Sequence, residues 1–76
     1  MLNVDEQEST AQVDIITARE REIIRHVVFG MRNAEVAAAL QISVSTVKNH
    51  LYHVFRKLGI RRRRELIGYA LRAGVV

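Results

Sequence analysis

The apolar residues between Ser43 and Gly59 repeat at intervals that only a helix brings onto one side of the chain. Four, three and four residues separate the members of this repeat, which are Val47, Leu51, Val54 and Leu58. Such spacing is typical of an amphipathic helix. The Ser43 hydroxyl is suited to cap its start and Gly59 to end it, which gives a helix of about 15 residues. The whole stretch contains no acidic residue.

Two helices are expected before this one. Thr17-Ala-Arg-Glu20 matches the capping box, in which the Thr17 hydroxyl accepts from the Glu20 amide and the Glu20 side chain accepts from the Thr17 amide. The helix that follows should end at Gly30, and its inner face should contain Ile23, Ile24, Val27 and Val28. Asn33 is the expected N-cap of a short second helix, AEVAAALQ. The inner face of this helix should contain Val36, Ala37 and Leu40.

A fourth helix is expected at about residues 65–73 (ELIGYALRA), with Gly74 as its stop. Its core side should contain Leu66, Tyr69, Ala70 and Ala73. We also expect Phe29 and Phe55 in the core. No proline, repeat or alternating strand pattern occurs in the chain. The fold class predicted is therefore all-α, with four helices.

The chain divides by charge into an acidic start and a basic body. Residues 1–22 contain six acidic and two basic residues, whereas residues 23–76 contain ten basic and two acidic residues. A basic body favours a polyanionic partner, nucleic acid more than a membrane, although basic surfaces also simply keep proteins soluble. Residues 1–14 lack apolar periodicity. We predict that they form a mobile acidic tail or linker and that residues 15–76 form the domain.

Several classes of function lack the residues they need. There is no cysteine for a disulfide or a thiolate zinc site, and no run approaches the roughly 18 apolar residues of a membrane span. His50 and His53 have the spacing of two metal ligands, but no third ligand supports a metal site. No nucleophile, base and orienting group combine to indicate an enzyme, and no cofactor is expected. Acids where a signal peptide needs positive charge favour the cytoplasm.

A short helix, a turn and a longer helix with a hydroxyl cap form a helix-turn-helix. Ala37 is small enough to allow a close crossing of the two helices. Ile42 in the turn and Val47 on the second helix are placed to fix the crossing angle. The outer face of the longer helix is then presented in a way that suits a DNA major groove.

Five motifs carry a resemblance to a known family. They are TAREREII (17–24), NAEVAAAL (33–40), ISVSTVKNHL (42–51), RKLGI (56–60) and RREL (63–66). With them, the chain from Ile16 to Val75 resembles the LuxR-type (GerE-like) helix-turn-helix domain of bacterial transcription regulators. The resemblance implies four helices, the third reading DNA and the fourth pairing two subunits. It assigns base contacts to Lys48, Asn49 and Tyr52.

The chain departs from the family pattern at three places. Gln41 stands in the turn where glycine is usual, so a left-handed backbone there costs about 1 kcal/mol. Arg62 stands where Ser or Asn usually caps the fourth helix. Tyr52 and His53 replace residues that are often small and polar, so the resemblance does not define the DNA sequence recognised.

The polar face of the third helix carries groups suited to DNA. Lys48 is suited to donate to guanine O6 or N7, Asn49 to pair with adenine, and Tyr52 to contact a phosphate or a thymine methyl group. The expected phosphate contacts are Arg32, Asn33, Ser45, Thr46, Arg56, Arg61 and Arg63. The alternative for each residue is a solvated side chain, and the run of four arginines is also compatible with an ordinary solvated loop.

The fourth helix has a second apolar stripe. Ile67 and Leu71 are four residues apart on a side that the core does not require. Gly68 weakens a helix by about 1 kcal/mol relative to Ala, which suggests that another backbone approaches closely. The expected dimer interface contains Arg64, Ile67, Gly68 and Leu71. A larger core that includes Ile67 and Leu71 is the alternative.

The sequence thus predicts a bacterial transcription regulator that binds double-stranded DNA sequence-specifically as a homodimer. RNA polymerase is a further candidate partner, and no membrane partner is expected. The chain is either a stand-alone regulator or the output domain of a longer one. Two alternatives stay open: a helical protein-interaction module of the same fold that has lost DNA binding, and a sigma-factor-like promoter-reading domain.

Overall fold

The computed structural model describes residues 15–75 and contains four α-helices there, with no strand in this range. They are α2 (Ala18–Val28), α3 (Asn33–Leu40), α4 (Val44–Leu58) and α5 (Arg63–Ala73). The prediction of an all-α, four-helix domain is confirmed. The tail predicted for residues 1–14 lies outside the described residues.

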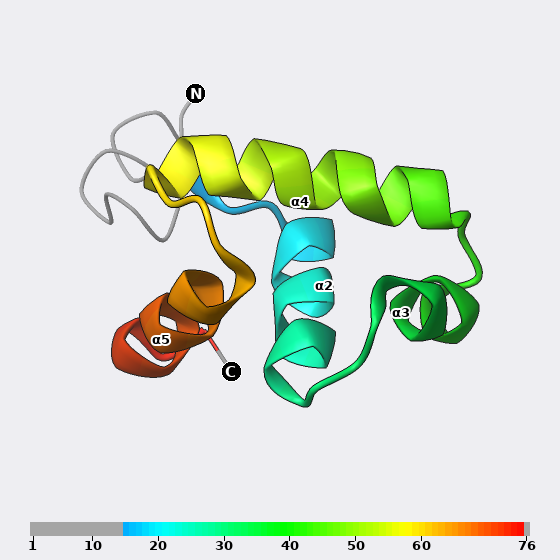
Figure 1. The fold of residues 1–76 in the computed structure, drawn as a ribbon, viewed down its shortest axis with the longest axis horizontal. Coiled ribbons are helices and arrows are strands. Elements are labelled where there is room, and N and C mark those ends of the chain that lie inside the picture. Colours follow the sequence, from blue (N-terminus) through cyan, green and yellow to red (C-terminus); the bar gives the residue numbers. More distant parts are fainter. Residues whose placement is uncertain (1–14, 76) are drawn as a thin grey trace, which may run out of the picture.

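The helices pack around α2, which contacts all three of the others (Figure 1). The long helix α4 runs across one end of α2, and α3 and α5 lie on either side of α2. Helix α3 also packs directly against α4. This arrangement leaves the side of α4 that faces away from α2 uncovered in the described structure.

The core is formed by the apolar stripes of all four helices. Its buried members are Ile16, Ile23, Ile24, Val27, Val36, Ala37, Val47, Leu51, Val54, Leu66, Ala70 and Val75. The stripe that predicts α4 is thus confirmed, with Leu58 half-buried against the core. Fully burying a Val, Leu or Ile side chain contributes about 1.5–3 kcal/mol. The core therefore holds α4 firmly to α2 and α3.

Local capping explains where most helices begin and end. The Thr17 hydroxyl accepts from the Glu20 amide at 3.1 Å and the Glu20 carboxylate accepts from the Thr17 amide at 2.9 Å, as the capping box predicts. Ser43 accepts from the Thr46 amide at 3.0 Å at the start of α4. Gln41 has a left-handed backbone with φ of 58°, where the family usually has glycine. The predicted strain at this turn is therefore real.

Two predicted helix starts need correction. Helix α3 begins at Asn33, so Arg32, not Asn33, is its N-cap residue, and Glu35 accepts from the Arg32 amide at 2.8 Å. Helix α5 begins at Arg63, two residues before the predicted start. There, Glu65 accepts from the Arg62 amide at 2.9 Å. In both helices the first-turn glutamate accepts from the amide of the N-cap residue, as in a capping box, but the N-cap side chain makes no hydrogen bond to the helix.

Two predicted core residues are exposed. Phe29 is 81% exposed because it lies just past the end of α2, two residues after the inward-facing Val27 and so on the opposite side. Ala73 at the end of α5 is also exposed. The chain turns back at Gly74, and Val75 is buried in the core, its amide donating to the Ala70 carbonyl at 3.0 Å.

A partly buried ion pair joins the start of α2 to the end of α4. Lys57 Nζ donates to the two Glu20 carboxylate oxygens at 2.8 and 3.0 Å, and Glu20 is only 4% exposed. Burial raises the pKa of Glu20, but the hydrogen bonds and charge of Lys57 and the Thr17 amide outweigh it, so the pKa is lowered from 4.5. The pair fixes the C-terminal half of α4 against α2.

The lowered pKa of Glu20 predicts a pH-dependent stability. A carboxyl whose pKa is lower in the folded state stabilises the fold above its ordinary pKa, and this contribution is lost as the pH falls through the lowered pKa. Glu20→Gln keeps the capping geometry but removes the charge, so it should lower the free energy of unfolding by about 1–3 kcal/mol at pH 6. The difference from wild type should shrink from pH 5 to pH 3 in denaturant titrations.

Glu22→Gln is the matched control for this prediction. Glu22 pairs with Arg19 on the surface of the same helix, with side chains 47% and 42% exposed. Exposed pairs contribute little, so this variant should unfold within about 0.5 kcal/mol of wild type at every pH. Equal effects of the two substitutions would show that the Glu20–Lys57 pair does not stabilise the fold.

Candidate nucleic-acid interface

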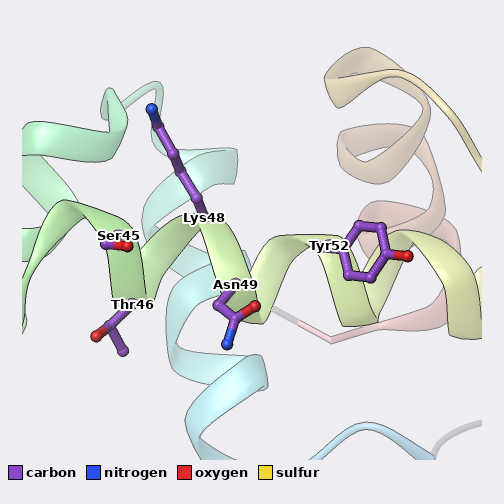
Figure 2. A pocket seen from close by; sticks show the side chains of 5 residues that line it. All are labelled: Ser45, Thr46, Lys48, Asn49 and Tyr52. Atoms are coloured by element: carbon purple, nitrogen blue, oxygen red, sulfur yellow. The ribbon is translucent and has the colours of Figure 1, made fainter.

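The outer surface of α4 carries a shallow polar hollow. It is lined by Ser45, Thr46, Lys48, Asn49 and Tyr52 (Figure 2). All five residues lie on α4 between Ser45 and Tyr52 and are exposed. In Figure 2, α4 lies in front of the other helices, with Lys48 extending to one side of the helix and Asn49 and Thr46 to the other. The three predicted base-reading residues therefore lie together on one accessible face.

The turn between α3 and α4 determines how this face is presented. Ala37 is buried between the two helices, and its carbonyl accepts from the Ile42 amide at 3.0 Å. Ile42 is half-buried and packs against the core. The buried Val47 and Leu51 then turn the opposite side of α4 outward. The helix-turn-helix predicted from the sequence is confirmed in the positions of these residues.

The start of α4 differs electrostatically from the starts of the other three helices. Helices α2, α3 and α5 each have a glutamate in the first turn, at positions 20, 35 and 65, whereas α4 has no acidic residue there. Backbone amides give a helix start a partial positive charge, which favours anions. The first turn of α4 keeps this charge uncompensated by a carboxylate of its own, next to Ser45 and Thr46.

The second half of the face contains an aromatic and basic cluster. Arg56 Nη1 donates to the Tyr52 hydroxyl at 3.2 Å, and the Arg56 guanidinium lies 5.7 Å from the centre of the Tyr52 ring. The His53 ring centre lies 5.7 Å from that of Tyr52. Tyr52 thus holds Arg56 in place on the surface of α4. His53, which the sequence analysis named as a departure from the family pattern and weighed as a metal ligand, lies exposed in the same cluster.

The predicted phosphate-contacting residues fall into two groups. Arg32, Ser45, Thr46, Arg56 and Arg61 are exposed. Arg63 and Asn33 are half-buried and hydrogen-bonded to each other, with Arg63 Nη1 donating to Asn33 Oδ1 at 2.8 Å. Arg63 Nη2 also donates to the Met31 carbonyl at 2.7 Å. Through these two hydrogen bonds Arg63 joins α5 to the start of α3. A guanidinium has five N–H donors, so further donors of Arg63 are free of these bonds.

The residues predicted to form the dimer interface on α5 differ in how far they are exposed. Leu71 is 60% exposed and Arg64 is exposed, whereas Ile67 is half-buried and packs against the core. Ile67 therefore contributes to the core as well as to the surface. A Cβ added at Gly68 would lie 3.1 Å from Arg72 Nη1, so it is the arginine of the next turn that approaches this glycine. A hollow beside it is lined by Ile60, Arg64, Glu65, Gly68 and Arg72.

Residues 15–75 also bear on metal binding and on membrane crossing. They contain no group of three or more His, Cys, Asp and Glu side chains arranged to hold a metal ion. His50 is half-buried and His53 is exposed. Within the same range, no helix has both the length and the apolar character needed to cross a membrane.

Comparisons with known proteins converge on one family. The family model described as "Bacterial regulatory proteins, luxR family" matches residues 14–70. The chain is 39% identical over 56 residues to a probable csgAB operon transcriptional regulatory protein of Salmonella typhimurium, covering 74% of the chain and 26% of that protein. It is 39% identical over 70 residues to the oxygen regulatory protein NreC of Staphylococcus aureus, covering 92% of the chain and 32% of NreC.

A solved structure of a response regulator is also similar to this chain. The crystal structure of the response regulator ChrA of a heme-sensing two-component system matches with a TM-score of 0.76 at 39% identity. The match covers 80% of this chain and 30% of that one. The chain therefore spans about a quarter to a third of the length of the proteins it resembles.

Proposed function

This chain belongs to the luxR family of bacterial regulatory proteins, and we propose that it regulates transcription by binding double-stranded DNA sequence-specifically through α4. The observation that carries the proposal is the exposed, acid-free polar face of α4 in a helix-turn-helix. A helix presented in this way has the width and the donors that a major groove requires. We also propose the cytoplasm as its location and RNA polymerase as a further partner.

Lys48 and Asn49 are the proposed base-reading residues. Both are exposed on the outer side of α4, between one and two turns from its uncompensated N-terminal end. The Lys48 ammonium is suited to donate to guanine O6 and N7, and the Asn49 amide to pair with adenine through two hydrogen bonds. Because Tyr52 is hydrogen-bonded to Arg56, its role is to hold that arginine against a phosphate and to contact the groove with its ring edge.

The phosphate contacts surround these two residues. Arg32 and Asn33 lie at the start of α3, Ser45 and Thr46 at the start of α4, and Arg56 near its end. Arg61 and Arg63 follow α4. Phosphate contacts position a protein on DNA without reading its sequence. Substitution of a base-reading residue and of a phosphate-contacting residue should therefore have different effects.

Lys48→Ala should weaken binding to the preferred sequence by about 1–3 kcal/mol and relax discrimination at particular base pairs. Arg61→Ala, by contrast, should weaken binding to all sequences alike, because a guanidinium on a phosphate carries no sequence information. The measurement is a titration of each variant with a duplex selected by the wild type from random DNA and with single-base-pair changes in it. Unchanged affinity and discrimination in Lys48→Ala would contradict docking through this face.

We propose that two subunits pair through α5 when DNA supplies two half-sites. Leu71 at 60% exposure, the exposed Arg64 and the half-buried Ile67 and Gly68 form the proposed interface. Such an interface is small, and pairing would therefore depend on the raised local concentration of two subunits on one duplex.

Leu71→Glu should abolish cooperative binding to paired half-sites while retaining single half-site binding. The exposed position predicts a melting temperature close to that of wild type, because little core packing is lost. Ala73→Glu adds the same charge at another exposed position of α5 and should leave cooperativity intact. Duplexes with one and two half-sites distinguish these outcomes in gel-shift titrations. A large drop in the melting temperature of Leu71→Glu would instead place Leu71 in the core.

A further inference from the structure

We propose that His53 is a further DNA-contacting residue, whose protonated imidazole binds a backbone phosphate beside the base-reading residues. The inference rests on the proposed function and extends it to a histidine on the same helix. Its first support is position. His53 follows Asn49 by four residues and precedes Arg56 by three, so on a helix its side chain adjoins both. All three side chains are exposed.

The surroundings of His53 hold it on the polar side of α4. Its ring centre lies 5.7 Å from that of Tyr52, with the two ring planes tilted by 58°. Tyr52 in turn accepts a hydrogen bond from Arg56. The neighbouring Val54 and Leu51 are buried on the other side of the helix, so the imidazole is not drawn into the core. The ring is therefore placed beside an arginine already assigned to a phosphate.

Among the described residues 15–75, the charges near His53 leave an imidazolium without an anionic partner. On α4 itself the neighbouring titratable groups are His50, Tyr52, Arg56 and Lys57, none of which is an anion at neutral pH. From α2, which packs against this half of α4, the carboxylate of Glu20 is bound to Lys57 at 2.8 Å, and Arg19 is paired with Glu22 at 3.2 Å. A DNA phosphate would supply the anion that residues 15–75 do not place beside His53.

Protonation changes what an imidazole offers to DNA. The neutral ring has one N–H donor, whereas the imidazolium has two donors and a positive charge. Imidazole side chains change charge close to neutral pH, so the contact would form within a range in which other side chains keep their charges. DNA binding would then be accompanied by proton uptake and would tighten as the pH falls.

The other two histidines of the chain provide matched controls. His26 lies near the end of α2, where its Nδ1 is 2.7 Å from the Glu22 carbonyl oxygen. His50 is on α4, three residues before His53, but it is half-buried, whereas His53 is exposed. Each therefore carries the same imidazole group as His53 without the same access to the groove. Replacing each by Gln separates a specific contact from a general gain of positive charge.

The experiment measures the affinity of the chain for a mixed-sequence DNA duplex at pH 8 and pH 5.5 at constant ionic strength. Wild type should bind about tenfold more tightly at pH 5.5, as expected for one charged hydrogen bond. A plot of the logarithm of the binding constant against the logarithm of the salt concentration should also be steeper by about 0.9 at pH 5.5. His53→Gln should lose both differences, and His50→Gln and His26→Gln should keep them. His53→Arg should bind at pH 8 as tightly as wild type at pH 5.5.

The outcomes separate this inference from the function on which it rests. If the affinity of His53→Gln for the duplex still depended on pH, the role of His53 would be overturned while DNA binding stayed established. The same holds if the pH dependence disappeared in His50→Gln or His26→Gln. Failure of wild type to bind duplex DNA at either pH would contradict the proposed function itself. Salt slopes for His53→Gln that still differ between the two pH values would likewise exclude a phosphate contact by this residue.

Discussion

Raising the salt concentration from 50 to 200 mM should weaken the binding of one subunit to duplex DNA by about 150-fold. The reason is the release of counterions by the four arginines proposed to contact phosphates, which are Arg32, Arg56, Arg61 and Arg63. With about 0.9 counterions released per contact, four contacts give a log–log slope of about −3.6. A fluorescence titration of a labelled duplex at several salt concentrations measures this slope directly.

Two substitutions make the salt prediction sharper. Arg61→Ala should lower the magnitude of the slope by about 0.9 for every sequence tested. Arg25→Ala is the matched control, because Arg25 is exposed in the last turn of α2, at the end that points away from α4 (Figure 1). It should leave the slope unchanged. A wild-type slope near zero, or equal effects of the two variants, would show that the α4 surface is not where phosphates bind.

A duplex with two half-sites provides a further check on the same prediction. If two subunits each use four cationic contacts, the slope for the paired complex should approach twice that for one subunit, about −7. Leu71→Glu, which should prevent pairing, should restore the single-subunit value. This comparison links the phosphate contacts to the proposed α5 interface without requiring a dimer in free solution.

Leu66→Ala should destabilise the domain by about 2–5 kcal/mol, the range for truncating a fully buried leucine. Leu66 is 0% exposed on the side of α5 that packs against α2. Small domains have little stability in reserve, since total stabilities are only about 5–15 kcal/mol. Urea unfolding followed by far-ultraviolet circular dichroism should therefore show a much lower unfolding midpoint than that of wild type.

Leu71→Ala is the matched control for this variant. It makes the same chemical change on the same helix, but at a side chain that is 60% exposed. Its effect on unfolding of the free protein should stay within about 0.5 kcal/mol. Duplex DNA should raise the apparent stability of Leu66→Ala, because a ligand that binds only the folded state shifts the equilibrium towards it. Equal losses in the two leucine variants would mean that α5 packs differently.

The sequence was sufficient for the features that depend on neighbours three or four residues away. The capping box at Thr17 and the Ser43 cap each involve groups three residues apart, and both are present as predicted. The apolar stripe of α4 is predicted from the helical repeat alone, and Val47, Leu51 and Val54 of this stripe are buried. The left-handed Gln41 was also foreseeable, since the turn geometry requires it of whichever residue stands there. Exposure of Lys48 and Asn49 follows from the same repeat.

Helix starts were less predictable where the usual capping residue is absent. Arg32 and Arg62 occupy the N-cap positions of α3 and α5 without a side-chain hydrogen bond to the helix. The compensating groups are Glu35 and Glu65, which lie inside the first turn. A glutamate three residues after a non-capping residue is a weaker signal than a hydroxyl, so the boundaries shifted by one and two residues.

Only the tertiary structure could decide which side chains from distant segments meet. Glu20 and Lys57 are 37 residues apart, and Arg63 and Asn33 are 30 apart, so no local spacing predicts either contact. Whether Ile67 or Leu71 is covered depends on where α2 stands beside α5, and the packing buries half of the first and leaves the second exposed. Helical periodicity determines which residues share a face of a helix. The packing of one helix on another determines how much of that face is covered, because coverage depends on neighbours that periodicity does not specify.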